Sequence, residues 1–317
     1  MAAVRAELAY FTRPPPGAPV PVMGSKETRH SLTAKHDVAI ADARALPMEL
    51  QANGVELFRH RTALVDWEDK AEVREVYYAE IAALVQRATG ADFVLPYNHI
   101  TRHSAADNFT QAFARFAHVD WVHSAGGASD AAVERLRAQL VRKLGLAEEE
   151  AGKLELCTVN TWQPWRQTVR ANPLALLDAA SVDLERDTMK YSFAGSGLRE
   201  QGFSKTAVGA DGTPLIGLTH SPQHRCKPPR YRCRLGCILL TTAAISLLTG
   251  VWYSEMREDE CLVFKQMDTR RDNSARLVFH SSFDNPCTEE GAEGRRSIET
   301  RVICGFAPPR ASEAPKL

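Results

Sequence analysis

A histidine and an aspartate separated by one residue form the first pattern in this sequence that could do chemistry. They are His118 and Asp120, within residues 116–121 (FAHVDW). On an extended strand the side chains alternate between faces, so both would project from the same face. A neutral imidazole and a carboxylate presented together can take two adjacent positions on Fe(II). A distant histidine can supply the third position and leave others open.

This pattern alone is weak evidence for a metal site. The chain contains ten histidines and 39 acidic residues among 317, so about one H-x-[DE] sequence is expected by chance. A histidine that is hydrogen-bonded to its strand neighbour would explain the same residues without a metal. The pair therefore needs support from another part of the chain.

The support comes from His280 and the arginine that follows it. Residues 274–284 (SARLVFHSSFD) predict a strand ending at His280, and the sequence R-R-S begins fifteen residues later at Arg295. A histidine ligand followed at this distance by R-x-S suits oxygenases that bind 2-oxoglutarate. The Arg295 guanidinium would hold the far carboxylate as a fork, Ser297 would add a hydrogen bond, and the 2-oxo acid would chelate iron.

Position, rather than the motif itself, makes Arg295 informative. R-x-S also begins at Arg29, Arg102 and Arg310. The alternative for Arg295 is a surface salt bridge with one of the nearby glutamates, Glu293 or Glu299.

Hydrophobic periodicity predicts the elements that must position these residues. One helix would begin near Asp66 and end at Gly90, and a second would run from about Asp130 to Gly145. Runs rich in β-branched and aromatic residues predict strands at 5–11, 37–45, 154–162, 189–194, 261–266, 276–283 and 298–306. This distribution favours an α+β chain with a β-sandwich or jelly-roll core.

Composition limits the classes of function. Hydrophobic residues make up 44% of the chain, and lysine plus arginine equals aspartate plus glutamate at 39 each. This balance predicts a globular protein without the charge that would attract nucleic acid, and no membrane association is expected. The N-terminus lacks a secretory pattern, and the seven cysteines do not suggest a disulfide framework. We therefore expect a cytoplasmic protein.

Several stretches along most of the chain resemble a family of fungal iron/2-oxoglutarate oxygenase-like hydroxylases and desaturases. The family includes the aspergillic acid hydroxylase/desaturase, the gibberellin desaturase and a cephem-methoxylase subunit. The matching stretches are AELAYF, VAIADARAL (38–46), 97–102, HVD, NTWQPW (160–165), NPLALLD (172–178), 252–268 and 280–301. The last is the most specific, because it contains a metal ligand, the carboxylate anchor and their spacing.

The resemblance implies a fold, a cofactor set and a chemistry. It implies a double-stranded β-helix (jelly roll) core with flanking helices. It also implies Fe(II) held by His118, Asp120 and His280, and 2-oxoglutarate anchored by Arg295 and Ser297. The reaction would hydroxylate, desaturate or cyclise a small-molecule intermediate of secondary metabolism. Relatives usually have N-x-W-R-P, so Gln163 departs from the pattern and could alter a contact that the arginine makes.

Two alternatives remain open at this point. A catalytically inactive member could act as the partner subunit of another biosynthetic enzyme, and a hydrolase could use zinc in the same three ligands. Arg102, Asn160 and Trp162 are candidates for substrate contacts, although a salt bridge or a structural role between strands would also explain them. The sequence does not predict the oligomeric state.

The domain organisation contains one anomaly. We expect a single oxygenase-like domain over 1–317 with a disordered tail at 307–317, but residues 226–251 break the family pattern. They join a basic, cysteine-rich half to an apolar half. A zinc site or a membrane helix fits them poorly, so we interpret them as a retained intron. Sequencing the mature transcript tests this: we expect the segment to be missing, and a message that encodes it would contradict the interpretation.

Overall fold

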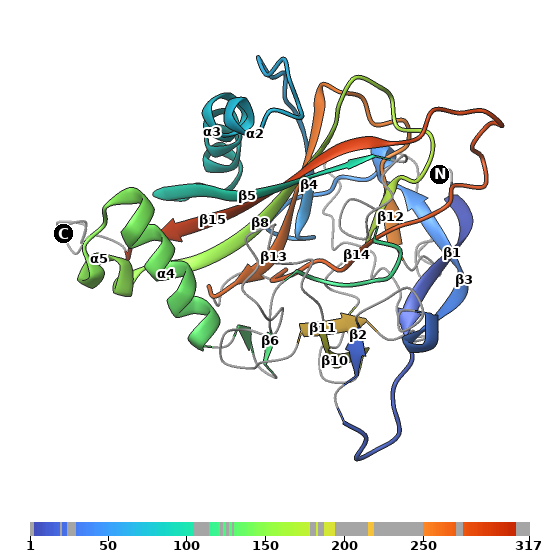
Figure 1. The fold of residues 1–317 in the computed structure, drawn as a ribbon, viewed down its shortest axis with the longest axis horizontal. Helices are drawn as coiled ribbons and strands as arrows, with labels where there is room; N and C mark the ends of the chain where they lie inside the picture. Colours follow the sequence, from blue (N-terminus) through green and yellow to red (C-terminus); the bar gives the residue numbers. More distant parts are fainter. Residues whose placement is uncertain are drawn as a thin grey trace, which may run out of the picture.

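Two five-stranded sheets form the centre of the protein (Figure 1). In this computed structural model the described residues are 3–19, 21–23, 30–103, 114–120, 123–124, 127–128, 130–177, 182, 187–193, 215–218, 250–270 and 275–308. The two sheets supply the elements that carry the residues expected to do chemistry.

The first sheet is antiparallel throughout and places β8 and β15 side by side. Its order is β4 (Val55–Arg59), β13 (Glu260–Asp268), β8 (Glu155–Pro164), β15 (Arg296–Phe306) and β5 (Phe93–His103). Residue Arg301 lies directly opposite Asn160, and Glu299 opposite Trp162. Pro96 is tolerated because β5 is an edge strand, and its pairing with β15 shifts register beside this proline.

The second sheet brings distant parts of the chain to one surface. Its order is β1 (Ala3–Phe11), β3 (Thr33–Asp42), β12 (Gly250–Trp252), β9 (Leu174–Leu176) and β14 (His280–Ser282). The β1–β3 pair is antiparallel and β12 runs parallel to β3. The position of His280 at the start of β14 therefore depends on pairing between β14 and β9.

Buried side chains from both sheets form a common apolar cluster. Trp162, Leu262 and Phe264 of the first sheet join Leu176 and Val251 of the second. Each of these side chains is at most 1% exposed. Burying an apolar side chain of this size contributes about 1.5–3 kcal/mol. This contact therefore holds the two sheets together around the residues that the strands carry.

Helical residues cover the outer face of the first sheet. The segment comprises α2 (Lys70–Glu72), a π-helical turn (Val73–Tyr77) and α3 (Tyr78–Thr89). Asp69, not Asp66, is the N-cap, because its side chain accepts a hydrogen bond from the Ala71 N–H. Apolar side chains of α3 pack on Val159 and Ile298 of the sheet. The helix ends at Gly90, whose φ of 70° is a left-handed conformation that glycine adopts readily.

Further elements surround this core. The helices α4 (Asp130–Leu144) and α5 (Glu148–Lys153) lie near the C-terminal end of β15 (Figure 1). The smaller pieces are η1 (Ala43–Ala45), β2 (Val22–Met23), β6 (His123–Ser124), β7 (Gly127–Ala128), β10 (Thr188–Phe193) and β11 (Leu215–Leu218).

The α+β expectation is confirmed, with differences in detail. The strand expected at 276–283 is limited to β14, and β4 and the short helix α5 were not anticipated. Residues 226–249 and 309–317 lie outside the described residues, so the interpretations of the insertion and the tail stay predictions. Gly250 and Val251, which we assigned to the insertion, are part of β12. Within the described ranges no helix is long and apolar enough to cross a membrane.

The packing of α3 predicts an asymmetric response to mutation. Ile81 is fully buried against the first sheet, so Ile81→Ala should lower the free energy of unfolding by about 2–5 kcal/mol. Arg87→Ala on the exposed face of the same helix should change it by less than about 0.5 kcal/mol. Urea denaturation of both variants measures the difference. Equal losses would contradict the packing described above.

Candidate metal centre

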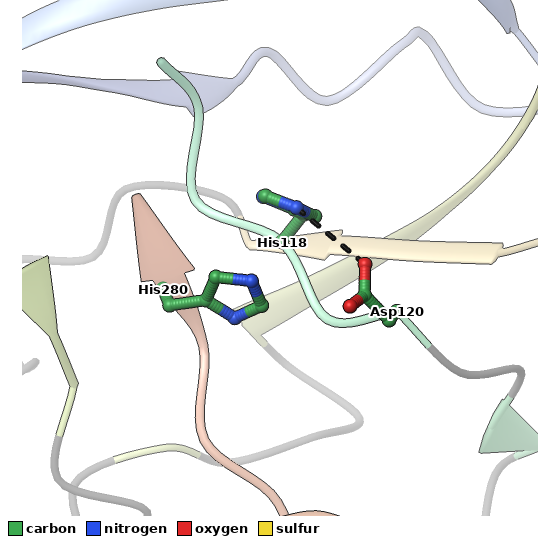
Figure 2. Close-up of side chains that lie close together, drawn as sticks. All are labelled: His118, Asp120 and His280. Atoms are coloured by element: carbon green, nitrogen blue, oxygen red, sulfur yellow. Dashed lines mark ion pairs between the residues drawn. The ribbon is translucent and has the colours of Figure 1, made fainter. Parts of the chain in front are cut away.

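Main-chain pairing brings the two predicted histidine ligands together. The His118 N–H donates to the His280 carbonyl at 3.2 Å, and the His280 N–H donates back at 3.0 Å. This pairing is an isolated antiparallel bridge, so the chain around His118 is not the regular strand that we predicted. One ligand atom from each of His118, Asp120 and His280 can be chosen so that all three lie within 4.8 Å of one another. Figure 2 shows the three side chains converging from these two segments.

A main-chain hydrogen bond determines which nitrogen of His118 can bind a metal. Its Nδ1 lies 2.8 Å from the carbonyl oxygen of Phe116, so Nδ1 carries the proton and donates it. The lone pair is then on Nε2, which lies 3.8 Å from Oδ1 of Asp120. Burial lowers the pKa of His118 to about 4 and also lowers the pKa of His280. Both imidazoles are therefore neutral near pH 7, as metal binding requires.

Two side chains hold one carboxylate oxygen of Asp120 and leave the other facing His118. Oδ2 accepts hydrogen bonds from Asn160 Nδ2 at 2.6 Å and from Arg301 Nε at 3.2 Å. The Asp120 N–H donates to Gln266 Oε1 at 2.8 Å, which fixes the backbone. Burial alone would raise the pKa of Asp120, but Arg301 and the two imidazoles hold it well below its usual range. The carboxylate is thus charged, with Oδ1 available as a ligand.

The donor set fits a divalent iron ion. Two neutral imidazoles and one ionised carboxylate make the 2-His-1-carboxylate triad of non-haem Fe(II) oxygenases. The hydrogen bond from Nδ1 of His118, together with those to Asp120, orients the ligands from outside, as is usual around bound metals.

A small pocket adjoins the two histidines and contains the predicted carboxylate anchor. It is lined by Arg102, Ala114, His118, Trp162, Leu174, His280, Ser282, Arg295 and Glu299. Its walls are partly apolar, and Arg102, Arg295 and Glu299 bring charged groups to it.

Arg295 is buried in this pocket and is not a surface residue. It is 2% exposed, and its Nη1 donates to the Asn172 carbonyl and, at 3.3 Å, to Ser282 Oγ. Its guanidinium lies 5.3 Å from the centre of the Trp162 ring. Burial lowers its pKa to about 9, so a bound anion would stabilise the charged form. The surface salt bridge with Glu293 is made instead by Arg296, at 2.6 Å.

Comparison with known proteins assigns the chain to a family. A model described as an oxidoreductase/YMDC permease-like domain matches residues 8–209 and 249–305. The chain belongs to this oxidoreductase family. The match is interrupted over 210–248, a range that includes most of the anomalous segment.

Similar proteins of known name confirm the resemblance to fungal hydroxylases and desaturases. The alpha-ketoglutarate-dependent dioxygenase phiK of Fungal sp. is 27% identical over 279 residues, covering 85% of this chain and 83% of the relative. The hydroxylase/desaturase CTB9 of Cercospora beticola is 28% identical over 281 residues, covering 80% and 71%.

A solved structure supports the fold. The iron and alpha-ketoglutarate-dependent endoperoxidase NvfI superposes with a TM-score of 0.70 at 19% identity, covering 96% of this chain and 99% of that chain. At this level of identity the likeness concerns the arrangement of the elements.

The structure separates the remaining predicted residues by position. Arg102 and Trp162 line the pocket, as a substrate contact would require. Asn160 contacts the carboxylate of Asp120, which favours a role in orienting a ligand. Ser297 is fully buried, and its Oγ has no hydrogen-bond partner within the described part of the chain. Their functional roles stay predictions.

Several residues of the site were not anticipated from the sequence, and three of them carry polar or charged groups next to Asp120 or the histidines. Gln266 and Arg301 contact Asp120, and Glu299 lines the pocket. A pattern in the sequence could have predicted Arg301 and Glu299. Together with Ser297 they occupy every second position on β15, so the three side chains share one face. Extending the predicted site along that strand at every second residue would have found both.

The departure from the family pattern at Gln163 lies away from the metal centre. Gln163 follows Trp162 on β8, and its side chain belongs to the opposite face of the sheet. Its Oε1 lies 2.7 Å from His60 Nδ1 and accepts a hydrogen bond from Tyr77 Oη at 2.9 Å. Its Nε2 donates to the Glu258 carbonyl at 2.6 Å. The substitution therefore changes a buried polar cluster beneath the helices and not a contact to the ligands.

The contacts of Asp120 predict that Arg301 controls metal affinity. Arg301→Met should weaken Fe(II) binding by roughly 10–100-fold, because the carboxylate loses the cation that keeps it charged and oriented. Anaerobic titration with Fe(II) measures the affinity, and circular dichroism checks the fold. Arg296→Met, which removes a surface arginine from the same strand, is the matched control. An unchanged affinity for Arg301→Met would contradict this role.

Proposed function

We propose that this chain is an Fe(II)- and 2-oxoglutarate-dependent oxygenase that hydroxylates, desaturates or cyclises a small-molecule intermediate of secondary metabolism. The observation that carries the proposal is the placement of His118, Asp120 and His280 beside the buried guanidinium of Arg295. Two histidines of the triad line the same pocket as Arg295, which is the arrangement that a chelating 2-oxo acid needs. The names of the relatives phiK and CTB9 support the same chemistry.

Different residues would bind Fe(II) and 2-oxoglutarate. His118 through Nε2, Asp120 through Oδ1 and His280 would hold Fe(II), with the imidazoles kept neutral by burial. Arg295 would grip the distal carboxylate of 2-oxoglutarate as a fork. The unpartnered hydroxyl of Ser297 would add a hydrogen bond to the same carboxylate.

In this proposal the cofactors provide the oxidation chemistry, and the protein residues orient the metal ligands and shield the pocket. When bound, Fe(II) and 2-oxoglutarate would activate oxygen, which oxidises the substrate and converts the 2-oxo acid to succinate and carbon dioxide. Trp162 and Leu174 contribute apolar walls that limit the access of water to the pocket. Asn160 and Arg301 keep the ligating carboxylate in one orientation.

The fold and domain organisation belong to the same proposal. Two five-stranded sheets that pack through a shared cluster suit a double-stranded β-helix core, and the likeness to NvfI supports it. We place the whole chain in one oxygenase-like domain. The interruption of the family match over 210–248 supports a non-family segment there.

Loss of one histidine should separate this function from its alternatives. His280→Ala should abolish the visible absorption band of the anaerobic Fe(II)·2-oxoglutarate complex and the release of succinate in air, because two ligands hold iron poorly. His30→Ala, at an exposed site, is the control and should change neither. Equal Fe(II) affinity in His280→Ala and the unaltered protein would favour a partner role. Fe(II) binding without consumption of 2-oxoglutarate would favour a different reaction.

Replacement of Arg295 should weaken the binding of 2-oxoglutarate but not that of Fe(II). Arg295→Gln should weaken 2-oxoglutarate binding by at least roughly 30-fold while Fe(II) affinity is retained, because the distal carboxylate loses a buried charge partner. Arg296→Gln is the matched control on the neighbouring, more exposed residue. Titration of the anaerobic Fe(II) protein with 2-oxoglutarate gives both affinities. If another residue anchors 2-oxoglutarate, the Arg295→Gln variant will bind it as tightly as the unaltered protein does, which would contradict the proposed role.

A further inference from the structure

Glu299 is a buried carboxylate that the proposed chemistry does not use. It lies on β15 between Ser297 and Arg301, and strand alternation puts all three side chains on one face. It is 5% exposed and lines the pocket together with His118 and His280. A carboxyl group in this position, beside both histidines, calls for an explanation.

Hydrogen bonds within the protein do not supply the explanation. Neither oxygen of Glu299 accepts a hydrogen bond from any residue that the structure describes. The nearest cation in an ion pair is Arg301, whose Nη2 lies 3.7 Å from Oε1, beyond hydrogen-bonding distance. Arg301 is engaged at a shorter distance with Asp120, at 3.2 Å from both Nε and Nη2. Glu299 thus keeps its acceptor capacity for something in the pocket.

Glu299 lines the pocket with only a long ion pair to Arg301, so a ligand that donates a hydrogen bond would complete its contacts. An acceptor that is removed from water without a hydrogen bond destabilises the protein by the full desolvation cost of the group. A ligand that donates a hydrogen bond at this point would recover that cost on binding. A ligand that carries only an apolar group there would leave the acceptor unsatisfied, which gives strong discrimination.

The cosubstrate does not have the complementary chemistry. At neutral pH 2-oxoglutarate carries two carboxylates and one ketone, so it has no hydrogen-bond donor. Its charges would be attracted to Arg102 and Arg295 on the pocket wall and repelled by Glu299. A hydrogen-bond donor that binds Glu299 would therefore belong to a molecule other than the cosubstrate.

We infer that Glu299 is the substrate-recognition residue of this pocket and accepts a hydrogen bond from a hydroxyl or an amide N–H of the substrate. The inference rests on the proposed function, because it places the substrate beside the iron ligands. It narrows the substrate class to compounds with a neutral donor close to the carbon that is oxidised. Hydrocarbon-like intermediates without such a donor would bind weakly.

Matched pairs of small probes test this inference directly. The probes are benzyl alcohol with benzyl methyl ether, and benzamide with N,N-dimethylbenzamide, so each pair differs by a capped donor. Their dissociation constants are measured from the change that each causes in the absorption band of the anaerobic Fe(II)·2-oxoglutarate complex. We expect the donor of each pair to bind about tenfold more tightly than its capped partner.

Two variants connect the preference to Glu299. Glu299→Leu should remove the preference, whereas Glu299→Gln should keep part of it, because the amide oxygen still accepts a hydrogen bond. Glu293→Leu, at a surface glutamate, is the control and should keep all of it. The glutamine variant also serves if the leucine variant fails to form the absorption band.

The possible outcomes are distinguishable. The inference is overturned if the unaltered protein does not prefer the donor of each probe pair, or if Glu299→Leu keeps that preference. Either result leaves the proposed function intact. Absence of the absorption band from the unaltered protein overturns the proposed function and the inference with it.

Discussion

The metal centre depends on the way one oxygen of Asp120 is held. Asn160 and Arg301 both donate to Oδ2, so Oδ1 remains as the oxygen that faces His118. The same contacts keep the buried carboxylate ionised, because the positive charge of Arg301 offsets the desolvation that would otherwise favour the protonated acid. Without them desolvation would favour the protonated acid, which binds a divalent ion less well than the carboxylate does.

The strand register of the first sheet positions the two residues that hold Asp120. Arg301 of β15 lies directly opposite Asn160 of β8, so the two donors reach Asp120 from adjacent strands. A shift of one residue would turn both side chains to the opposite face, where α3 packs. The second sheet has a corresponding role, since pairing of β14 with β9 sets the position of His280. The function therefore depends on strand pairing far more than on local sequence.

The sequence was sufficient to predict the three side chains that cluster but not the network of contacts around them. His118, Asp120 and His280 could be found because a short motif and a spaced arginine are visible along the chain. The contact of Arg301 with Asp120 joins residues 181 positions apart, and the contact of Gln266 joins residues 146 positions apart. Such contacts follow only from sheet register, which short-range periodicity does not determine. The same limit applies to Gln163: the face that it occupies becomes clear only once β8 is placed between β13 and β15.

A crystal structure of the protein with Mn(II), as a redox-inert substitute for Fe(II), and 2-oxoglutarate tests the central claim most directly. The metal should be bonded to Nε2 of His118, to Oδ1 alone of Asp120 and to His280, with Oδ2 still hydrogen-bonded to Asn160 and Arg301. The distal carboxylate of 2-oxoglutarate should lie on Arg295. A metal bound at another site, or bonded to both oxygens of Asp120 with Arg301 displaced, would contradict the claim.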